Sequence, residues 1–286
     1  MSGAAAIPEP AALAKPPVMR ITPPSGWWAI PLGELWNYRE LLYFFVWRDI
    51  KIRYKQTAIG AAWAVLQPFL AMIIFSIFGR LARISSQGLP YPIFYYSALL
   101  PWMYFAAALQ NATNTIVENQ RLITKVYFPR LALPLSAVLS GLVDFGVSFV
   151  MFIIMMIYYR IHPTAALLWF PLFLLLAVLT ALGVGLWLSA LNAIYRDVRY
   201  VLPFLVQFWF WASPVAYPSS LVPEKWRWLY GLNPMAGVIE GFRRSLAGNG
   251  EPPSGLIFVS TGVVLVVLLS GVVYFQKMET TVADVV

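Results

Sequence analysis

The chain has 286 residues, of which 60% are hydrophobic and only 11% are charged, and its mean hydropathy is +0.71. Soluble domains carry about 25% charged residues. One water-soluble core cannot bury this much apolar surface, so lipid must be the solvent for most of the chain. There is no cysteine, which excludes disulfides, iron–sulfur clusters, zinc–thiolate sites and thiol catalysis. His162 is the only histidine, and the net charge of +8 bears on orientation and anionic headgroups rather than on nucleic acid.

Residues 1–26 are predicted to be a disordered tail. They contain six prolines, and Glu9 and Lys15 interrupt every apolar run. A cleavable signal peptide needs an unbroken apolar stretch of about 7–15 residues, so none is predicted here.

The rest of the chain is predicted to cross a membrane about six times. A spanning helix needs about 20 apolar residues. Six stretches without charge, or with one charge only, reach that length: 56–79, 84–117, 131–159, 161–195, 200–223 and 252–276. We therefore expect an all-α membrane protein with a membrane domain over residues 58–276. Most Lys and Arg residues fall on the side that holds both termini, so both termini, including residues 277–286, are expected to be cytoplasmic.

Residues 27–57 are predicted to form a helix that lies in the cytoplasmic interface. No helix breaker occurs over 34–55, and the segment ends in a cluster of cations at Arg48, Lys51, Arg53 and Lys55. Such a cluster favours contact with anionic headgroups. A first transmembrane helix is excluded because only the short run 41–47 is free of charge.

Two connections on the same side are short and charged. Thr115 and Glu118 have the spacing of a capping box, which predicts a short helix that Pro129 would stop. The alternative is a tight, solvated connection over 115–130. Residues 192–199 form a similar short turn.

The segment 217–248 is too polar to span and too aromatic for an open loop. Pro214, Pro218, Pro223 and the pair Asn233-Pro234 divide it into pieces. We expect two short helices that re-enter the outer leaflet.

Motifs for catalysis are missing from the sequence. It contains no phosphate-binding glycine loop, and we predict no catalytic residue, metal site or cofactor in this chain. Asp144 is the only acidic residue inside a predicted span, which suggests either a proton relay or a packing and hydrogen-bonding role. Its small neighbours Ser140, Gly141 and Ser148 favour the second role.

Two predicted spans combine aromatic rings with a glutamine on one helical face. These residues are Trp63, Gln67 and Phe78 in the first span, and Phe204, Gln207, Phe208 and Trp211 in the fifth. Sugars offer apolar C–H faces that stack on rings and hydroxyls that bond to amides, so the two faces suggest a sugar conduit. The alternative is an ordinary interfacial belt of aromatic residues.

Several motifs together resemble one family. They are Tyr38 to Leu42, Arg48 to Thr57, Gly60 and Trp63 followed by Leu66-Gln67-Pro68, Asn119 to Pro134, Asn192 to Val198, and Asn233-Pro234-Met235 through Glu240 to Arg243. Over residues 34–280 the chain resembles the membrane (permease) subunit of ABC exporters for cell-surface polysaccharides, which serve O-antigen, capsule and teichoic acid export.

The resemblance implies a homodimer in the inner membrane that pairs with two copies of a separate ATPase subunit, which binds Mg-ATP, and that exports a lipid-linked polysaccharide. It assigns the interfacial segment the role of a gate helix, with Arg48, Asp49, Lys51 and Arg53. It makes 115–130 an ATPase-coupling segment, with Glu118, Arg121, Lys125, Tyr127 and Arg130. The residues of the conduit would line the channel.

Two other functions stay open at this point. The same architecture could export a small hydrophobic drug or a lipid. A membrane glycosyltransferase or ligase would need a catalytic cluster, and the outer side offers only Glu224, Glu240 and Glu251, with no histidine beside them.

Overall fold

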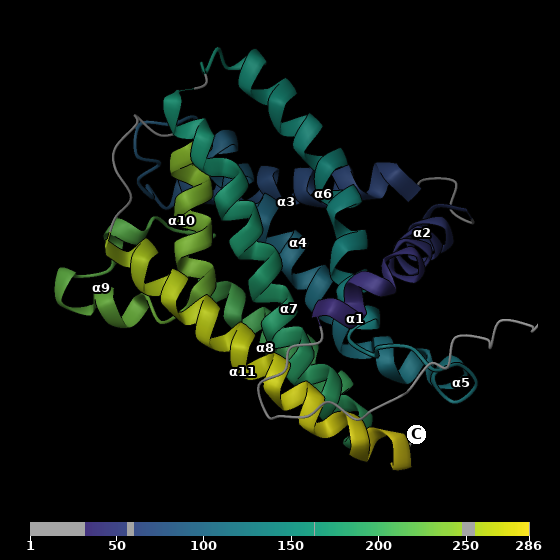
Figure 1. The fold of residues 1–286 in the computed structure, drawn as a ribbon. Coiled ribbons are helices and arrows are strands. Elements are labelled where there is room, and N and C mark those ends of the chain that lie inside the picture. The colour runs from purple at the N-terminus through teal and green to yellow at the C-terminus, as the bar shows by residue number, and fades with distance from the viewer. Residues whose placement is uncertain (1–31, 56–59, 163, 248–254, 286) are drawn as a thin grey trace, which may run out of the picture.

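A computed structural model of the chain describes residues 32–55, 60–162, 164–247 and 255–285 (Figure 1). These residues form helices joined by turns, and no strand occurs among them, which confirms the all-α prediction. The predicted tail 1–26 lies outside the described residues, as do residues 27–31 and 56–57 of the predicted interfacial segment.

Among the residues that the structure describes, five helices are long and apolar enough to cross a membrane. They are α3 (Gly60–Leu81), α4 (Tyr91–Glu118), α6 (Ala132–Tyr158), α7 (Phe170–Ile194), which follows the 3-10 turn η1 (Ala165–Trp169), and α11 (Gly255–Val285). The predicted fifth span instead contains α8 (Val198–Ala212), whose 15 residues reach about 22 Å. This is less than the hydrocarbon thickness of about 30 Å. The count of six crossings therefore stays a prediction that depends on α8.

Helix α4 is the centre of the molecule. It packs against α3, α6, α7, α8 and α10 (Pro234–Ala247), and most of its residues are buried. The side chains of Phe94, Tyr95, Tyr96 and Phe105 are fully buried along it. Rings from neighbouring helices meet these side chains, such as Trp209 of α8, whose centroid lies 5.0 Å from that of Phe105. Apolar side chains of the surrounding helices thus share one core with α4.

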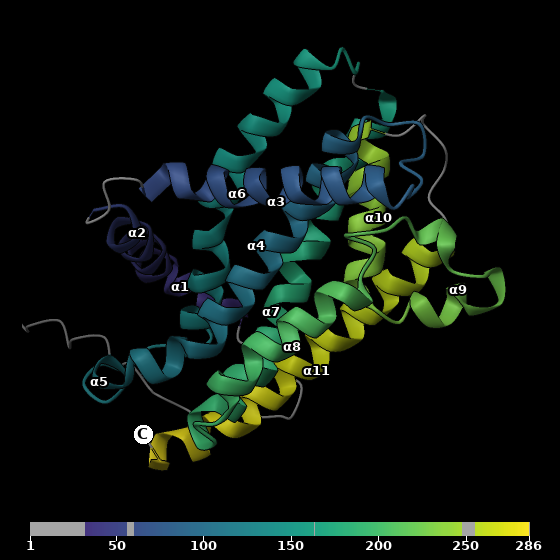
Figure 2. The ribbon, with the colours of Figure 1, turned by 180° about the vertical axis from the view of Figure 1, so that it is seen from behind.

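Helices α7 and α11 lie side by side through two glycines (Figures 1 and 2). A Cβ atom on Gly271 would lie closer to the carbonyl oxygen of Gly183 than real Cβ contacts allow. One turn further, the rings of Trp187 and Tyr274 stack with centroids 4.1 Å apart. Close approach of backbones at small residues is the usual way in which membrane helices gain packing energy.

One end of the molecule, which we call the α5 end, gathers α2 (Arg39–Lys55), α5 (Gln120–Ile123) and the C-terminus (Figure 2). Helix α1 (Leu32–Asn37) precedes α2. Phe45 of α2 is buried against Phe128, with ring centroids 5.4 Å apart. Tyr43, Phe44 and Ile52 of α2 are exposed. Helix α2 therefore packs with one face on the protein and leaves an aromatic face open.

The capping box predicted at Thr115 is wrong. Thr115 is buried inside α4, and Glu118 is the last residue of that helix, so α4 continues where the prediction placed a helix start. Packing of α4 against α7 extends the helix past the local signal. The short helix of this connection is α5, which starts after Asn119 and ends at Ile123, well before Pro129.

The opposite end, which we call the α10 end, holds two short helices, as expected for residues 217–248. Helix α9 (Glu224–Tyr230) follows the 3-10 turn η2 (Ser219–Leu221), is exposed and carries Trp226 and Trp228, whereas α10 is buried from Met235 to Arg243. Arg243 donates a hydrogen bond to the carbonyl of Pro214 at 2.9 Å and lies 3.9 Å above the Phe94 ring. Helix α10 is thus part of the core, and its position relative to the bilayer stays a prediction.

The glycine contact predicts a specific loss of stability. We expect Gly271→Ala to destabilise the protein by about 2 kcal/mol, because the new methyl group collides with the backbone of α7. Thermal unfolding in detergent measures the loss. Gly262→Ala is the matched control on the same helix, because a methyl group added there would meet no atom within 4 Å. Equal melting temperatures for the two variants would contradict the contact.

Candidate functional site

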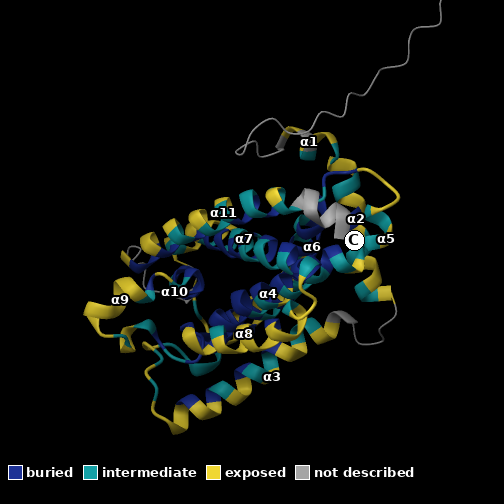
Figure 3. Cartoon of the chain, turned by 90° about the horizontal axis from the view of Figure 1, so that it is seen from below, coloured by how far each residue is buried: buried dark blue, intermediate teal, exposed yellow. Residues whose placement is uncertain are grey.

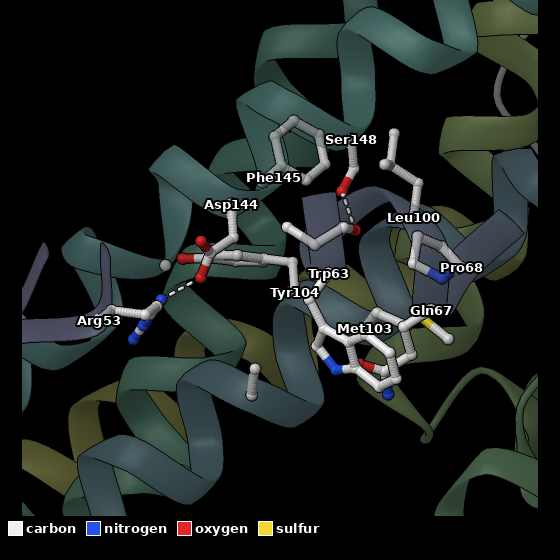
Figure 4. A pocket seen from close by; sticks show the side chains of 13 residues that line it. Arg53, Trp63, Gln67, Pro68, Leu100, Met103, Tyr104, Asp144, Phe145 and Ser148 are labelled. Atoms are coloured by element: carbon white, nitrogen blue, oxygen red, sulfur yellow. Dashed lines mark hydrogen bonds and ion pairs between the residues drawn. The ribbon is translucent and has the colours of Figure 1, made fainter. Parts of the chain in front are cut away.

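A cavity of about 370 Å³ opens between α2, α3, α4 and α6 (Figure 4). Most of its wall is apolar or aromatic. Its lining residues are Arg53, Trp63, Ala64, Gln67, Pro68, Leu100, Met103, Tyr104, Ala107, Gly141, Asp144, Phe145 and Ser148. Three residues from the predicted gate and conduit sets, Arg53, Trp63 and Gln67, therefore surround one space.

Pro68 explains why α3 is joined to α6 at this cavity. A proline inside a helix has no N–H for the carbonyl four residues earlier, which here is that of Ala64. The hydroxyl of Ser148 on α6 donates to this carbonyl at 2.7 Å (Figure 4). In a membrane an unpaired carbonyl is costly, so this bond stabilises the contact between the two helices.

Asp144 lies at the end of the cavity that faces α2, with two partners from that helix. The guanidinium of Arg53 forms an ion pair with it (Figure 4). The hydroxyl of Tyr54 donates to its second oxygen. Burial, together with the hydrogen bond to Asp144, raises the pKa of Tyr54 to about 12, so the phenol keeps its proton at neutral pH. The carboxylate thus fixes the end of α2 against α6, in agreement with the hydrogen-bonding role.

The other predicted gate residues connect α2 to the rest of the α5 end. Arg48 pairs with Asp49 at 2.9 Å and donates to the side-chain oxygen of Asn119 at 2.9 Å. Asn119 is the residue between α4 and α5, so the expected gate helix and coupling segment are in direct contact. Lys51 points away from this network and lies 4.4 Å from the centre of the Trp47 ring.

The predicted conduit residues form two exposed faces. Helix α3 exposes Trp63, Gln67 and Phe78, and α8 exposes Phe204, Gln207, Phe208 and Trp211. Both faces lie on the same side of the molecule (Figure 3). The two helices meet at Phe75, whose ring centroid lies 5.6 Å from that of Phe210 and 6.3 Å from that of Trp211. The described residues of one chain place these faces side by side, and Phe78 does not line the cavity.

The predicted coupling residues are mostly exposed around α5. Glu118, Arg121, Lys125 and Tyr127 are exposed, and Arg130 is partly buried. Val126 beside Tyr127 is exposed as well. A turn with exposed cations and apolar side chains at the end of the molecule is a surface that a partner protein can contact.

The sequence does not predict the contacts between residues far apart in the chain that hold the site together. Tyr54, Asn119 and Ser148 lie inside predicted segments, but no local pattern marks their partners. Glu240, which the sequence places in the family motif and among the outer acidic residues, is buried and holds Arg244 at 2.9 Å and the Ser219 hydroxyl at 2.6 Å. Its spacing of four residues from Arg244 on α10 was the available signal.

The chemistry of the cavity suits binding rather than catalysis. Rings of Trp63, Tyr104 and Phe145 give an apolar wall, while the amide of Gln67 offers hydrogen bonds. No group of three or more His, Asp or Glu side chains that could hold a metal occurs among the described residues. Helices long and apolar enough to span a membrane around such a site define an integral membrane protein.

Comparison with known proteins gives the family. A family model described as "ABC-2 type transporter" matches residues 40–247. The chain is 31% identical over 252 residues to the O-antigen export system permease protein RfbA of Klebsiella pneumoniae, covering 86% of this chain and 95% of that protein. The protein of the same name from Myxococcus xanthus is 28% identical over 254 residues, with 88% and 97% covered. The polysialic acid transport protein KpsM of Escherichia coli is 24% identical over 202 residues, with 70% and 78% covered.

The chain belongs to the ABC-2 type transporter family, since the family model covers most of it. The resemblance inferred from the sequence motifs is thereby confirmed.

The contact between α2 and α6 yields a second prediction. We expect Arg53→Gln to increase the mobility of a spin label attached at Ile52→Cys, because the ion pair to Asp144 is lost. The chain has no native cysteine, so labelling is specific. Lys55→Gln removes an equal charge from the exposed end of the same helix and is the control. Identical label mobility in both variants would show that the ion pair does not hold α2.

Proposed function

We propose that this chain is the membrane permease of an ATP-driven exporter that moves a lipid-linked cell-surface polysaccharide, similar to O-antigen, outward across the inner membrane. The permease works as a homodimer with two copies of a separate ATPase subunit, which binds the Mg-ATP. The chain itself is not an enzyme, and both of its termini lie in the cytoplasm.

The observation that carries this proposal is an agreement between the names of the related proteins and the chemistry of the exposed faces of α3 and α8. Proteins named as O-antigen export permeases match nearly the whole chain. The two faces add a chemical reason, because aromatic rings alternating with the amides of Gln67 and Gln207 suit sugar rings and their hydroxyls. In the homodimer, these faces of both copies would line the passage.

The α5 end supports the partnership with an ATPase. Arg48 ties the gate helix α2 to Asn119, next to α5. A displacement of the exposed residues Arg121 and Lys125 would be transmitted to α2 through this hydrogen bond. From α2 it would be transmitted to the cavity through Arg53. This gives a physical route from a partner at the α5 end to the site.

The other two functions fit less well. A drug or lipid exporter would present aliphatic rather than amide-bearing faces on α3 and α8. A glycosyltransferase or ligase needs a free acidic cluster, but Glu240 is buried and paired with Arg244, and Glu251 lies outside the described residues.

The proposed coupling role predicts which charged residues of this chain contact the ATPase subunit. We expect charge reversal at both Arg121 and Lys125 to abolish co-purification of the ATPase subunit in mild detergent, because both cations are exposed at the α5 end. Lys225→Glu on α9, at the opposite end, serves as the control for altered charge. Unchanged co-purification of the reversed variant would remove the coupling role.

The conduit faces predict a loss of export without a loss of protein. We expect Gln67→Ala and Trp211→Ala each to lower surface polysaccharide severalfold while the amount of permease in the membrane stays constant. Leu269→Ala, on the exposed surface of α11, should leave export unchanged. Export at the native level in both conduit variants would contradict the assignment.

A further inference from the structure

A second space in the membrane region lies between α3 and α6, at the α10 end. It is a groove of about 510 Å³. Its lining residues are Phe69, Met72, Ile73, Ser76, Ile77 and Arg80 of α3, Pro92 of α4, and Met151, Ile154, Met155, Tyr158 and Tyr159 of α6. The wall is aliphatic for most of its length, and Ile77, Ile154 and Tyr158 are exposed, so the groove is open to the surroundings of the protein.

The length of the groove corresponds to one leaflet. Phe69 and Arg80 lie eleven residues apart on α3. At about 1.5 Å per residue this is about 16 Å, or half of a hydrocarbon core of about 30 Å. The groove is therefore long enough for the acyl chain of one leaflet, and Arg80 stands at its α10 end.

Three arginines lie in or next to the chain segments that form the α10 end of the groove. Arg80 lines the groove, Arg83 follows α3, and Arg160 follows α6. All three are exposed, and none of them forms a side-chain hydrogen bond or an ion pair with another described residue. The connections 82–90 and 159–164 contain no acidic residue. The cations are thus concentrated beside an apolar groove without a counter-charge of their own.

The backbone supports this interpretation, because α3 and α6 end in the same motif. Arg83 and Arg160 adopt φ angles of 53° and 56°, a left-handed conformation for which glycine is the usual residue. In each case the arginine and the isoleucine after it donate back to the helix, at distances of 2.9–3.2 Å. The acceptors are the carbonyls of Arg80 and Gly79 in α3 and of Ile157 and Met156 in α6. Arginine thus occupies the position usual for glycine at the ends of both helices that flank the groove. This repetition suggests that the two guanidinium groups have a functional role there.

We propose that this groove binds an anionic phospholipid, with an acyl chain along α3 and α6 and the headgroup phosphate held by Arg80, Arg83 and Arg160. Guanidinium groups match phosphate oxygens in charge and in hydrogen-bond geometry. The unpaired, buried hydroxyl of Ser76 in the groove wall is available to an ester oxygen of the lipid.

A second copy of the chain fits this surface less well than a lipid. In a twofold contact both copies bury the same patch, so each copy would bring its own arginines into one interface. Neither connection supplies a carboxylate to offset the repulsion. A phospholipid supplies both the apolar chain and the missing negative charge.

Native mass spectrometry of the purified chain in nonionic detergent tests the proposal, with phosphatidylglycerol and phosphatidylcholine of identical acyl chains as probes. We expect phosphatidylglycerol to bind about tenfold more tightly, a preference that the double variant Arg80→Gln, Arg160→Gln abolishes. Lys225→Gln with Arg227→Gln removes two exposed cations from α9, and this control should keep the preference. Loss of the preference in both double variants would show that the preference depends on the overall charge of the protein. That result would overturn the proposed site.

A second pair of variants tests the groove itself. Ile77→Trp should fill it and weaken phosphatidylglycerol binding at least fivefold, whereas Val266→Trp on the exposed surface of α11 should not. Equal affinity in both variants would place the lipid elsewhere. Displacement of the lipid by free inorganic phosphate would show an ion site instead, and disulfide cross-linking between copies at Ile77→Cys would show an interface between copies. Each of these results overturns the proposal. The assay needs neither the ATPase nor a polymer, so its failure leaves the export proposal untouched.

Discussion

The structure depends on one constraint, which is that hydrocarbon cannot hydrogen-bond to the polar groups of the chain. Where Pro68 removes a backbone donor from α3, Ser148 of α6 satisfies the free carbonyl. Where α6 carries Asp144, Arg53 and Tyr54 of α2 satisfy the carboxylate. The contacts that hold α2 and α3 against α6 are therefore consequences of polar groups that needed a partner, and the cavity lies between them.

The same constraint suggests which surfaces lipid would not cover. Helix α4 is buried over most of its length, while α3 and α8 expose the amides of Gln67 and Gln207 among aromatic rings. Apolar tails cannot solvate an amide, so these faces require water, a ligand or another copy of the chain. A homodimer that brings the two faces of each copy around a wet passage meets this requirement, and it is the arrangement expected for an exporter of a hydrated polymer.

The sequence predicts the features that depend on local pattern and composition. The helix class, a helix in the basic segment that forms α2, the exposed faces of α3 and α8, and two short helices between α8 and α11 all follow from it. The capping box at Thr115 fails because packing of α4 against α7 overrides a short signal. The pairs Arg53–Asp144 and Arg48–Asn119 join residues 91 and 71 positions apart, and neither sequence pattern nor spacing indicates such partners. The end of α8 also involves a distant partner, because Ser213, the residue after the helix, accepts a hydrogen bond on its hydroxyl from Asn233 just before α10.

The most direct test of the account asks whether the faces of α3 and α8 meet water in the membrane. Single cysteines at positions 67 and 207 can be treated with a membrane-impermeant maleimide in assembled transporters, since the chain has no other thiol. The account predicts rapid labelling at both positions and none at a cysteine in place of Val266, which is exposed on α11. If positions 67 and 207 resist the reagent as position 266 does, the two faces lie in lipid and do not line a passage.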